Sequence, residues 1–471
     1  MDQGELLIEL EPVSTPALIT INVDKTTIMN PIRHFLQNLR YDDLPQPIVE
    51  QAVRCLYDLV ATAAAGSQTQ LSAIIHRHVA QQFAAPQQGP SARPLLGGQA
   101  VSVSGAALAG GMMIDAIDAH DGHRLTKGHV GCALLPSLVA LLEASGKKPS
   151  GPEFITLLVA GYEIGTRAGI ALHATAPDYH TSGAWNAVNC AALGAHLLGA
   201  SATQFEHAIG IAEYHGPRSQ MMRGVDHPTM LKDGSGWGAM AGVSAAFLAM
   251  DGFTGAPAVT VTRPEVESIW ADLGDNWLIM DQYFKPFPCC RWAHPCIDAA
   301  LSLIRGGDMD LDQIESIRVY TFHEATRLNQ GIPINTEQAQ YATAFPIAAA
   351  VVYGRVEVAQ IDGAGLTDPA TLAMCRRVSL VEHQAYNALF PAERWAHVTI
   401  VLKDGRQFTS EPHTAVGDPD NPLPVSRLEA KYNALTRPVW GENKAQQVMV
   451  ATRKLLEPTS SLAGYLALLR T

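Results

Sequence analysis

The 471-residue sequence lacks the paired cysteines that build disulfide frameworks and zinc sites. Its seven cysteines are an odd number without a C-x-x-C pair, which favours a reducing cytoplasm over a secreted, disulfide-bonded fold. The acidic N-terminal stretch MDQGELLIELEP has no basic region followed by an apolar core, so we expect no secretory signal. No apolar run approaches the roughly 18–20 residues that a membrane-spanning helix requires, and we expect no membrane partner.

The sequence is also poor in positive charge. Lysine and arginine number 33 against 45 for aspartate and glutamate, a net charge of −12. Phosphate backbones would repel such a chain, so we expect no nucleic-acid partner, although a locally basic pocket could still bind a small anionic substrate. The sequence has no G-x-G-x-x-G between a strand and a helix, no G-x-x-x-x-G-K-[ST] and no G-x-S-x-G. Dinucleotide, nucleotide and serine-hydrolase functions therefore lose their usual support.

The sequence is rich in apolar segments with helical periodicity. Hydrophobic residues make up 47% of the chain, and its length favours two domains. Residues 28–275 repeat apolar side chains at helical spacing, as in QAVRCLYDLVATAAAG. Residues 276–415 predict a smaller α+β domain, because IESIRVYTF and RRVSLVEH read as strands and WAHVTIVLKDGRQFTSEP as a hairpin turning at Asp404-Gly405. Residues 416–471 are helical again and are expected to pack on the first domain, and residues 1–27 form an N-terminal extension.

Polar chemistry is most concentrated in AHDGHRLTKGHVGCALLP, residues 119–136. Its histidines and carboxylates could bind zinc or iron, but the spacing fits no helical metal signature. Gly122 and Gly128 favour a flexible polar loop instead, and we expect no metal. His129 directly precedes the apolar helix, whose dipole opposes a protonated imidazole. His129 is therefore a candidate neutral general base.

Three further segments carry candidate residues. PDYHTSGAWNAVNCAA places a histidine before a helix of small residues, where an incidental histidine beside an N-capping threonine is the alternative. HGPRSQMMRGVDHPTMLKDGSGWGAMAG concentrates cations that can hold carboxylates, with a solvated basic loop as the alternative. FKPFPCCRWAHPCIDAA lies at the predicted domain junction, where pockets are common, and its adjacent cysteines are expected to pack as small hydrophobes. The candidates are His180, Arg218, Lys232, Lys285, Arg291 and His294.

These segments, in this order, resemble the MmgE/PrpD family, which includes 2-methylcitrate dehydratase, cis-aconitate decarboxylase and iminodisuccinate epimerase. The resemblance runs over nearly the whole chain from about residue 30 and includes LYDLVATAAAG and AQYATAFPIAAAVVYG. It implies a mainly α fold, with a large all-helical domain interrupted by a smaller α+β lid domain, in a homodimer. It also implies lyase or isomerase chemistry on small di- and tricarboxylic acids, without metal or organic cofactor, between the two domains.

The resemblance also implies which residues of this chain correspond to the family's functional motifs. Asp118 and Asp121 match an Asp-rich segment, and His129 matches the histidine that follows it. His180 matches the histidine of the next motif, and Lys232 matches the lysine before the small-residue helix.

At the entrance to the lid, Lys285 matches the family's lysine and His294 a later histidine. Two departures stand out. Cys290 replaces the histidine that decarboxylase-like members tend to have shortly after the lid lysine, and Phe345 replaces a tyrosine of the lid helix. Both departures weigh against cis-aconitate decarboxylation.

The sequence thus predicts a cytoplasmic, cofactor-free lyase, most simply a dehydratase of a 2-methylcitrate-like hydroxy acid. Decarboxylation and epimerisation are the alternatives within the family, and a metal-dependent hydrolase or a non-catalytic carboxylate-binding protein are the alternatives from other classes. In the leading hypothesis His129 and His180 form the acid/base pair, and Asp118 or Asp121 orients an imidazole. The groups expected to hold a polycarboxylate are Lys232, Lys285, Arg218, Arg291 and His294.

Overall fold

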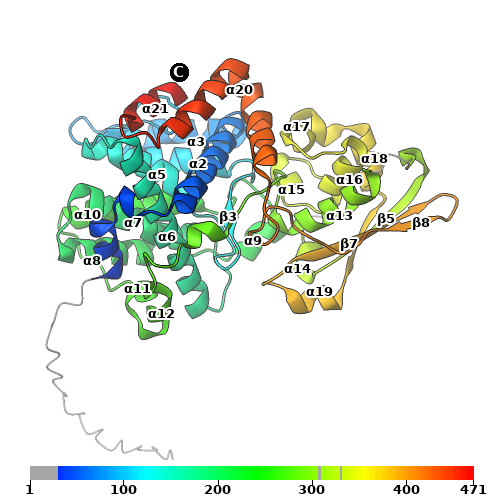
Figure 1. Ribbon diagram of the computed structural model, residues 1–471, viewed down its shortest axis with the longest axis horizontal. Helices are drawn as coiled ribbons and strands as arrows, with labels where there is room; N and C mark the ends of the chain where they lie inside the picture. Colours follow the sequence, from blue (N-terminus) through cyan, green and yellow to red (C-terminus); the bar gives the residue numbers. More distant parts are fainter. Residues whose placement is uncertain (1–29, 306–308, 329–330) are drawn as a thin grey trace, which may run out of the picture.

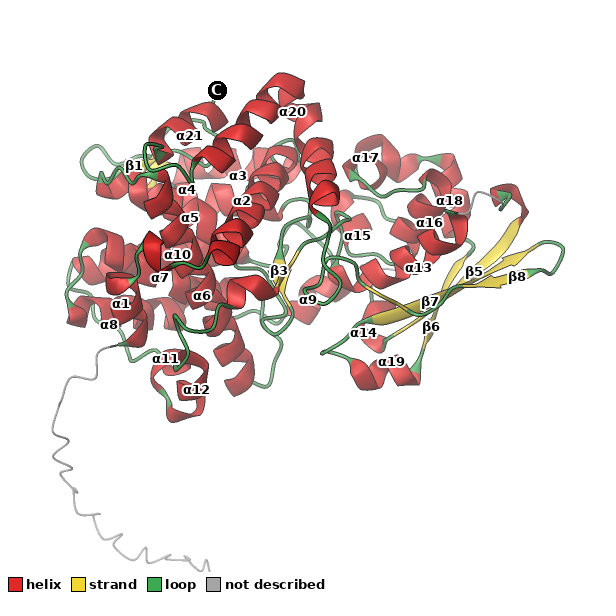
Figure 2. Cartoon of the chain, in the orientation of Figure 1, coloured by secondary structure: helices red, strands yellow, loops and turns green. Residues whose placement is uncertain are grey.

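The computed structural model describes residues 30–305, 309–328 and 331–471, and the predicted extension over residues 1–27 lies outside these. The described chain is mainly helical, with its longest strands together at one end of its long axis and short strands elsewhere (Figure 2). Its buried apolar side chains form two clusters. One cluster draws on residues 32–284 and 423–469, here called the helical unit, and the other chiefly on residues 287–402, here called the sheet unit.

The helical unit is a stack of apolar helices around α5, α6 and α7. Small residues let these helices approach closely, and the contact between α7 and α10 is the most extensive among the described elements. A Cβ added at Gly238 of α10 would meet the backbone of Gly183, and one at Gly242 would meet the backbone of Ala187. Its longer helices are α1 (Pro31–Asn38), α2 (Gln46–Gly66), α3 (Gln70–Gln82), α4 (Val103–Asp115), α5 (Gly131–Ser145), α6 (Gly151–Thr175), α7 (Gly183–Leu198), α8 (Ala202–His215) and α10 (Ser235–Met250).

Short elements and the C-terminal helices complete the helical unit. The long helix α20 packs along α2, so residues after the sheet unit return to the first part of the chain (Figure 1). A capping box of Ser201 and Gln204 starts α8. The remaining elements are α9 (Met221–Asp226), α11 (Val259–Thr262), α12 (Glu267–Trp270), α20 (Val425–Lys454), α21 (Leu462–Leu469), and the paired strands β1 (Ser91–Ala92) and β2 (Val101–Ser102).

Helix α6 qualifies the expectation that no apolar run reaches membrane-spanning length. Its 25 residues are long and apolar enough to cross a bilayer by length and composition alone. However, 83% of its apolar window is buried inside the protein, which is how the core helix of a large helical stack behaves. A Ser150–Glu153 capping box starts this helix.

The sheet unit packs helices on a five-stranded sheet. The strand order is β6-β5-β7-β8, with β9 also paired to β7, and only the β5–β6 pairing is parallel. Ile317 and Val319 of β5 are both buried, as their alternation predicts, and the hairpin at Asp404-Gly405 joins β7 to β8. The strands are β5 (Ile314–Thr321), β6 (Val378–Glu382), β7 (Trp395–Leu402), β8 (Gln407–Thr409) and β9 (His413–Thr414). The helices are α13 (His294–Ile304), α14 (His323–Thr326), α15 (Thr336–Gln340), α16 (Ala344–Tyr353), α17 (Val358–Ile361), α18 (Pro369–Cys375) and α19 (Gln384–Leu389).

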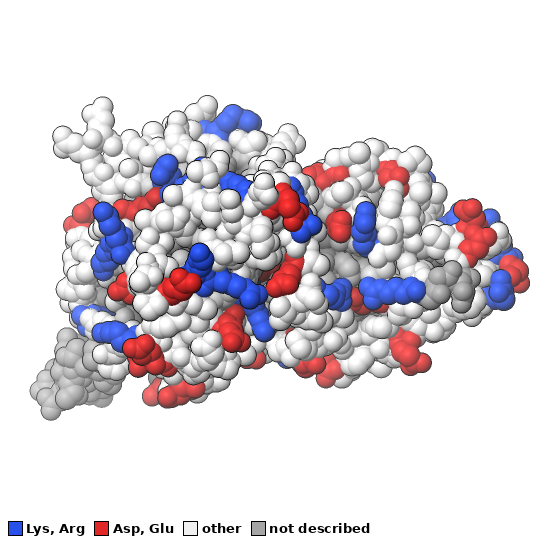
Figure 3. Space-filling model, turned by 45° about the horizontal axis from the view of Figure 1, so that its top comes forward, with Lys and Arg blue, Asp and Glu red and all other residues white. Residues whose placement is uncertain are grey.

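A two-stranded ribbon lies next to the point where the chain passes from the helical unit to the sheet unit. Strand β3 (Gly122–His123) pairs antiparallel with β4 (Gln282–Tyr283), so the polar loop before α5 is tied to the segment that enters the sheet unit. The predicted boundaries at residues 275 and 415 stay predictions. On the face shown in Figure 3, Lys and Arg lie interspersed with Asp and Glu and do not gather in one basic area.

Candidate active site

A cavity of about 260 Å³ lies where the two units meet. The helical unit contributes the loop before α5, the loop before α7, Asp233 and Tyr283 of β4. The sheet unit contributes residues 290–292, α14, Tyr341 after α15 and the loop before β7, and the buried side chains of α9 pack with this unit. The candidates Asp118, His129, Lys285 and Arg291 all line this cavity, so four residues spread along the sequence share one partly open space.

The loop between α4 and α5 is buried, so the alternative of a solvated polar loop is wrong. His120 and Asp121 are completely inaccessible to solvent, and Asp118, His123 and His129 are at most 9% exposed. Within this loop, β3 is paired with β4, and Lys285, shortly after that ribbon, contacts Asp118. Burying so many polar groups is unfavourable unless they are paired, and their pairing sets the electrostatics of the cavity.

His129 is held as a neutral imidazole with one nitrogen free. Its Nδ1 lies 2.5 Å from the backbone oxygen of Asp121, which can only accept, so Nδ1 carries the proton and Nε2 has the lone pair. Burial holds the pKa of His129 well below its usual value, and the neighbouring His120 and Lys285 lower it further. The backbone N–H of His129 donates to Ser182 Oγ, 3.0 Å away. The ring therefore keeps an unprotonated Nε2, two residues before α5 begins, and its role as a base stays a prediction.

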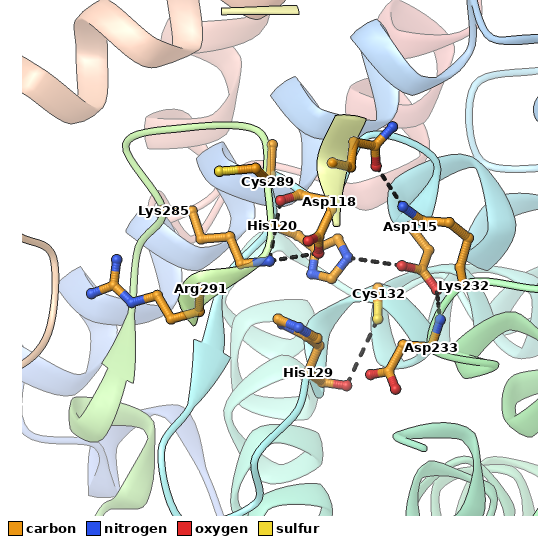
Figure 4. Close-up of polar contacts among 12 residues, drawn as sticks. Asp115, Asp118, His120, His129, Cys132, Lys232, Asp233, Lys285, Cys289 and Arg291 are labelled. Atoms are coloured by element: carbon orange, nitrogen blue, oxygen red, sulfur yellow. Dashed lines mark hydrogen bonds and ion pairs between the residues drawn. The ribbon is translucent and has the colours of Figure 1, made fainter. Parts of the chain in front are cut away.

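Asp118 and Lys285 form a buried ion pair across the two units. Lys285 Nζ lies 2.5 Å from Asp118 Oδ1 and 3.1 Å from the backbone oxygen of Asp118. Figure 4 shows the two side chains pointing toward each other, with His129 beside them. Burial alone would lower the pKa of Lys285, but the Asp118 carboxylate raises it above its ordinary value. Burial likewise opposes ionisation of Asp118, yet Lys285 and Lys232 bring its pKa below the usual range. Lys285 is thus a permanent cation, not a base.

Backbone strain gathers at the same place. Within the described residues, three non-glycine residues have a positive φ: Asp118 (47°), Lys127 (52°) and Lys232 (54°). Asp118 and Lys127 line the cavity, and Lys232 lies directly before Asp233, which also lines it. Such conformations are costly for residues with a Cβ and persist where surrounding structure fixes them, often at functional sites.

Lys232 connects the helical unit to α15. Its Nζ donates to Oε1 of Gln340 and lies 5.2 Å from the centre of the Tyr341 ring. Asp233 accepts from the backbone N–H of Ser182 at 3.0 Å, and burial together with the Asp115 carboxylate raises the pKa of Asp233 to about 7. The phenol of Tyr341 lines the cavity, and burial raises its pKa well above the ordinary value, so this hydroxyl stays protonated.

One cluster has the residue types of a metal site. Ligand atoms of Asp115, Asp118 and His120 lie within 4.8 Å of one another. However, the Lys285 ammonium already pairs with Asp118, and Asp115 accepts from the backbone N–H of Asp233 at 3.3 Å while Nε2 of His120 lies 3.3 Å from its other oxygen. The donors are satisfied by protein groups, and this arrangement fits an ion-pair network better than a cation site.

The other sequence candidates lie around the cavity without lining it. His180 is buried beside it, and its Nδ1 lies 2.8 Å from the Asp178 oxygen, whereas its neighbour Tyr179 lines the cavity. Asp121 lies behind His129 and accepts from the Tyr162 hydroxyl. Arg218 is on the exposed surface. His294 is completely buried, with Nε2 3.1 Å from the Cys289 oxygen.

Arg291 lines the cavity, but its terminal nitrogens are already bound. It donates to Asp418 at 2.7 Å and to the backbone oxygen of Val416 at 2.9 Å, and its guanidinium stacks over the Tyr283 ring at 4.7 Å. In Figure 4 its guanidinium points away from Lys285. Arg291 therefore mainly holds residues 415–418 against the cavity wall, and its charge is already neutralised by Asp418.

Several cavity residues escaped the sequence reasoning. Tyr341 lies within the quoted segment AQYATAFPIAAAVVYG, but a tyrosine before an apolar helix reads as core. Tyr179 and Tyr283 adjoin predicted candidates, which is a signal that could have found them. Arg394 stands alone in PAERWAH, with no spacing or cluster to mark it.

Comparison with known proteins agrees with this arrangement. The family model described as the MmgE/PrpD N-terminal domain matches residues 31–265, and that described as the MmgE/PrpD C-terminal domain matches residues 287–455. The chain belongs to the MmgE/PrpD family. The family models thus meet between residues 265 and 287, close to the β3–β4 ribbon of this MmgE/PrpD chain.

Curated relatives of this MmgE/PrpD chain include cis-aconitate decarboxylases. The Aspergillus terreus enzyme is 24% identical over 90% of this chain and 92% of its own length. The Homo sapiens enzyme is 24% identical over 85% of both chains, and the Mus musculus enzyme is 25% identical over 77% of this chain and 78% of its own. These matches support an enzyme of the lyase type.

The two departures from the decarboxylase pattern differ in where they lie. Phe345 is completely buried in the apolar cluster of the sheet unit and does not line the cavity. Cys290 does line it, and burial raises the pKa of its thiol to about 12, which leaves it neutral and a poor nucleophile. Only Cys290 therefore changes the chemistry of the cavity wall directly.

Proposed function

We propose that this protein is a cofactor-independent lyase for a small tricarboxylic acid, with decarboxylation of a cis-aconitate-type acid as its reaction. The supporting observation is that His129, the Lys285–Asp118 pair and Tyr341 share one buried cavity. Cations at such a site offset the charge of a polycarboxylate, and burial strengthens that interaction. The named relatives support decarboxylation over the other reactions of the family.

In the decarboxylation, the bond between the methylene carbon and its carboxylate breaks and carbon dioxide leaves. The electron pair forms a new double bond, and the former double bond places its pair on the carbon beside a remaining carboxylate. Lys285 is a fixed cation that can stabilise the charge growing on that carboxylate. His129 Nε2 first takes up one proton from solvent and then hands it to the carbon. Burial, His120 and Lys285 keep this imidazole neutral in the ligand-free protein, and the negative charge of a trianionic substrate opposes their effect and favours protonation of the ring.

Dehydration of a 2-methylcitrate-like acid is the second candidate, and the neutral state of His129 favours it. A free lone pair on Nε2 can remove a proton from the carbon beside a carboxylate. Hydroxide is a poor leaving group and needs a proton, which the Tyr341 hydroxyl can donate. Loss of carbon dioxide needs no such proton, so Tyr341 separates the two reactions.

Proton NMR in deuterated water tests the proposal with cis-aconitate, citrate and 2-methylcitrate as separate substrates. We expect loss of carbon dioxide from cis-aconitate with deuterium incorporated at the protonated carbon. His129→Asn should lower turnover at least about 100-fold, whereas the exposed control His34→Asn should not.

Tyr341→Phe then distinguishes the candidates, because it should impair water loss strongly and carbon dioxide loss weakly. Turnover of none of the three acids would overturn the lyase proposal. Full activity of His129→Asn would remove His129 from the mechanism.

A further inference from the structure

The side chain of Arg394 is the least satisfied cation of the cavity wall. It lies in the loop between α19 and β7, is 6% exposed, and lines the same cavity as His129 and Lys285. Its Nε and Nη1 atoms are buried without any hydrogen-bond partner, and Nη2 makes no hydrogen bond to the residues that the structure describes. A guanidinium carries five N–H donors and keeps its charge, so burying it in this state is costly.

Other arginines and lysines of the cavity have partners. Lys285 pairs with Asp118, and Arg291 pairs with Asp418. Arg327 pairs with Asp226 at the edge of the cavity. Lys127 makes no ion pair among the described residues, but its Nζ lies 5.5 Å from the centre of the Tyr179 ring. Arg394 differs from the three paired cations because none of the acidic residues that line the cavity, Asp118, Asp233 and Glu324, forms an ion pair with it in the described structure. The fold therefore holds this guanidinium in place for a group that the protein itself does not supply.

A second unsatisfied donor lies on β3, where Gly122 pairs with the cavity-lining Tyr283. Nδ1 of the next residue, His123, accepts the backbone N–H of Leu125 at 3.2 Å, so its proton is on Nε2, and Nε2 is buried without a partner. Burial, together with the charges of Arg124 and Arg394, lowers the pKa of His123 to about 3, which keeps the ring neutral. The Arg394 guanidinium alone presents a fork of N–H groups that is complementary to an anion with two oxygens, and the ribbon beside the cavity holds a further free donor.

We propose that Arg394 forms the subsite for one carboxylate of a polycarboxylate substrate, while Lys285 serves another carboxylate near His129. The inference rests on the proposed function for its substrate class. Arg394 would then set specificity, because an acid with fewer carboxylates would leave the guanidinium buried and unpaired. Removing the charge of Arg394 should lower the free-energy cost of burying this side chain in the ligand-free protein. It should also weaken binding of the polycarboxylate.

Binding measurements separate this role from a structural one. Calorimetric titration would use propane-1,2,3-tricarboxylate, which carries three carboxylates and does not react, and pentanedioate, the same chain without the central carboxylate. We expect Arg394→Gln to weaken tricarboxylate binding about 10- to 100-fold. The tricarboxylate affinity of Arg394→Lys should lie between those of the unaltered protein and Arg394→Gln, because lysine keeps the charge but lacks the two-pronged N–H geometry of the guanidinium. The control Arg318→Gln, on the exposed side of β5, should bind as the unaltered protein does.

Thermal unfolding without ligand supplies the second readout. The melting temperature of Arg394→Gln should equal or exceed that of the unaltered protein, whereas a structural arginine would lower it. Unchanged tricarboxylate binding in Arg394→Gln, or a lowered melting temperature, overturns the subsite. Binding by the unaltered protein without turnover of any acid overturns the lyase proposal and leaves the subsite standing. Absence of tricarboxylate binding to the unaltered protein overturns both.

Discussion

The two walls of the cavity satisfy their charges in different ways. On the wall around the α4–α5 loop, the lysines meet an anion or a neutral acceptor: Lys285 binds Asp118, and Lys232 donates to Gln340. On the wall formed by the loop before β7, the Arg394 guanidinium has no hydrogen-bond or ion-pair partner among the described residues. The lysines of the first wall are thus paired before a ligand arrives, and the arginine of the second wall is not.

This difference distinguishes side chains that are fixed in place to act on the substrate from a side chain that is left unpaired to bind it. Groups that act on the substrate must be held in one geometry beforehand, and buried pairs fix Lys285 and the His129 ring. A group that selects the substrate gains most when its only good partner is the substrate itself. The strained backbone at Asp118, Lys127 and Lys232 fits the same division, because the first two line the cavity on the helical unit's side and Lys232 directly precedes Asp233 there.

Breaking the Lys285–Asp118 pair should have the largest effect. Lys285→Met leaves a buried carboxylate without its counter-ion, so the free energy of unfolding should fall by about 3–5 kcal/mol. Turnover should fall about 100- to 1,000-fold because the fixed cation is lost. Denaturant unfolding and steady-state kinetics measure the two quantities.

The double variant Asp118→Asn/Lys285→Met separates the two losses. It should regain most of the stability, because no unpaired charge remains, and none of the activity. Recovery of activity along with stability would show that the pair serves only the fold.

Much of the arrangement could be predicted from residue pattern. Helical periodicity predicted α2 and α6, alternation predicted β5, and the Asp404-Gly405 pair predicted the β7–β8 hairpin. The position of His129 before a buried helix predicted a neutral imidazole, and burial indeed holds its pKa low. These features depend on interactions between residues close in the chain, or on one dominant physical effect.

What escaped prediction depends on contacts between distant segments. His180 has the sequence surroundings of a site residue, yet its ring hydrogen-bonds locally and Tyr179 faces the cavity instead. Arg291 and Arg394 are both arginines of the sheet unit, and only the fold shows that Asp418 satisfies one while nothing described satisfies the other. Gly122 and Gly128 suggested an exposed loop because sequence cannot show what covers it.

A smaller effect should come from Asp121, behind the first wall. Burial and the Asp58 carboxylate raise the pKa of Asp121 to about 7, above its value of about 4 in the unfolded chain. A raised carboxyl pKa contributes stability that is complete below about pH 4 and is lost as the pH rises through about 7. The melting temperature of the unaltered protein should therefore fall from pH 5 to pH 8.

Asp121→Asn should make this fall shallower, because the amide does not titrate. The exposed Asp275→Asn serves as control and should keep the full slope. An unchanged slope in Asp121→Asn would show that Asp121 is ionised throughout this range.

The smallest effect should come from the exposed pair at the edge of the second wall. Nη2 of Arg327 donates to both oxygens of Asp226, at 2.6 and 2.8 Å, and joins the end of α14 to α9 across the two units. Both side chains are more than a third exposed, so the pair should contribute about 0.2–1 kcal/mol, and salt should screen it. Arg327→Gln should therefore raise KM only a few-fold at low salt, and this difference should shrink at high salt. Arg406→Gln removes a comparably exposed pair with Asp404 on the distant β7–β8 hairpin and should leave KM unchanged. A salt-independent rise in KM would mean that Arg327 contacts the substrate directly, and the second wall would then contain two binding cations instead of one.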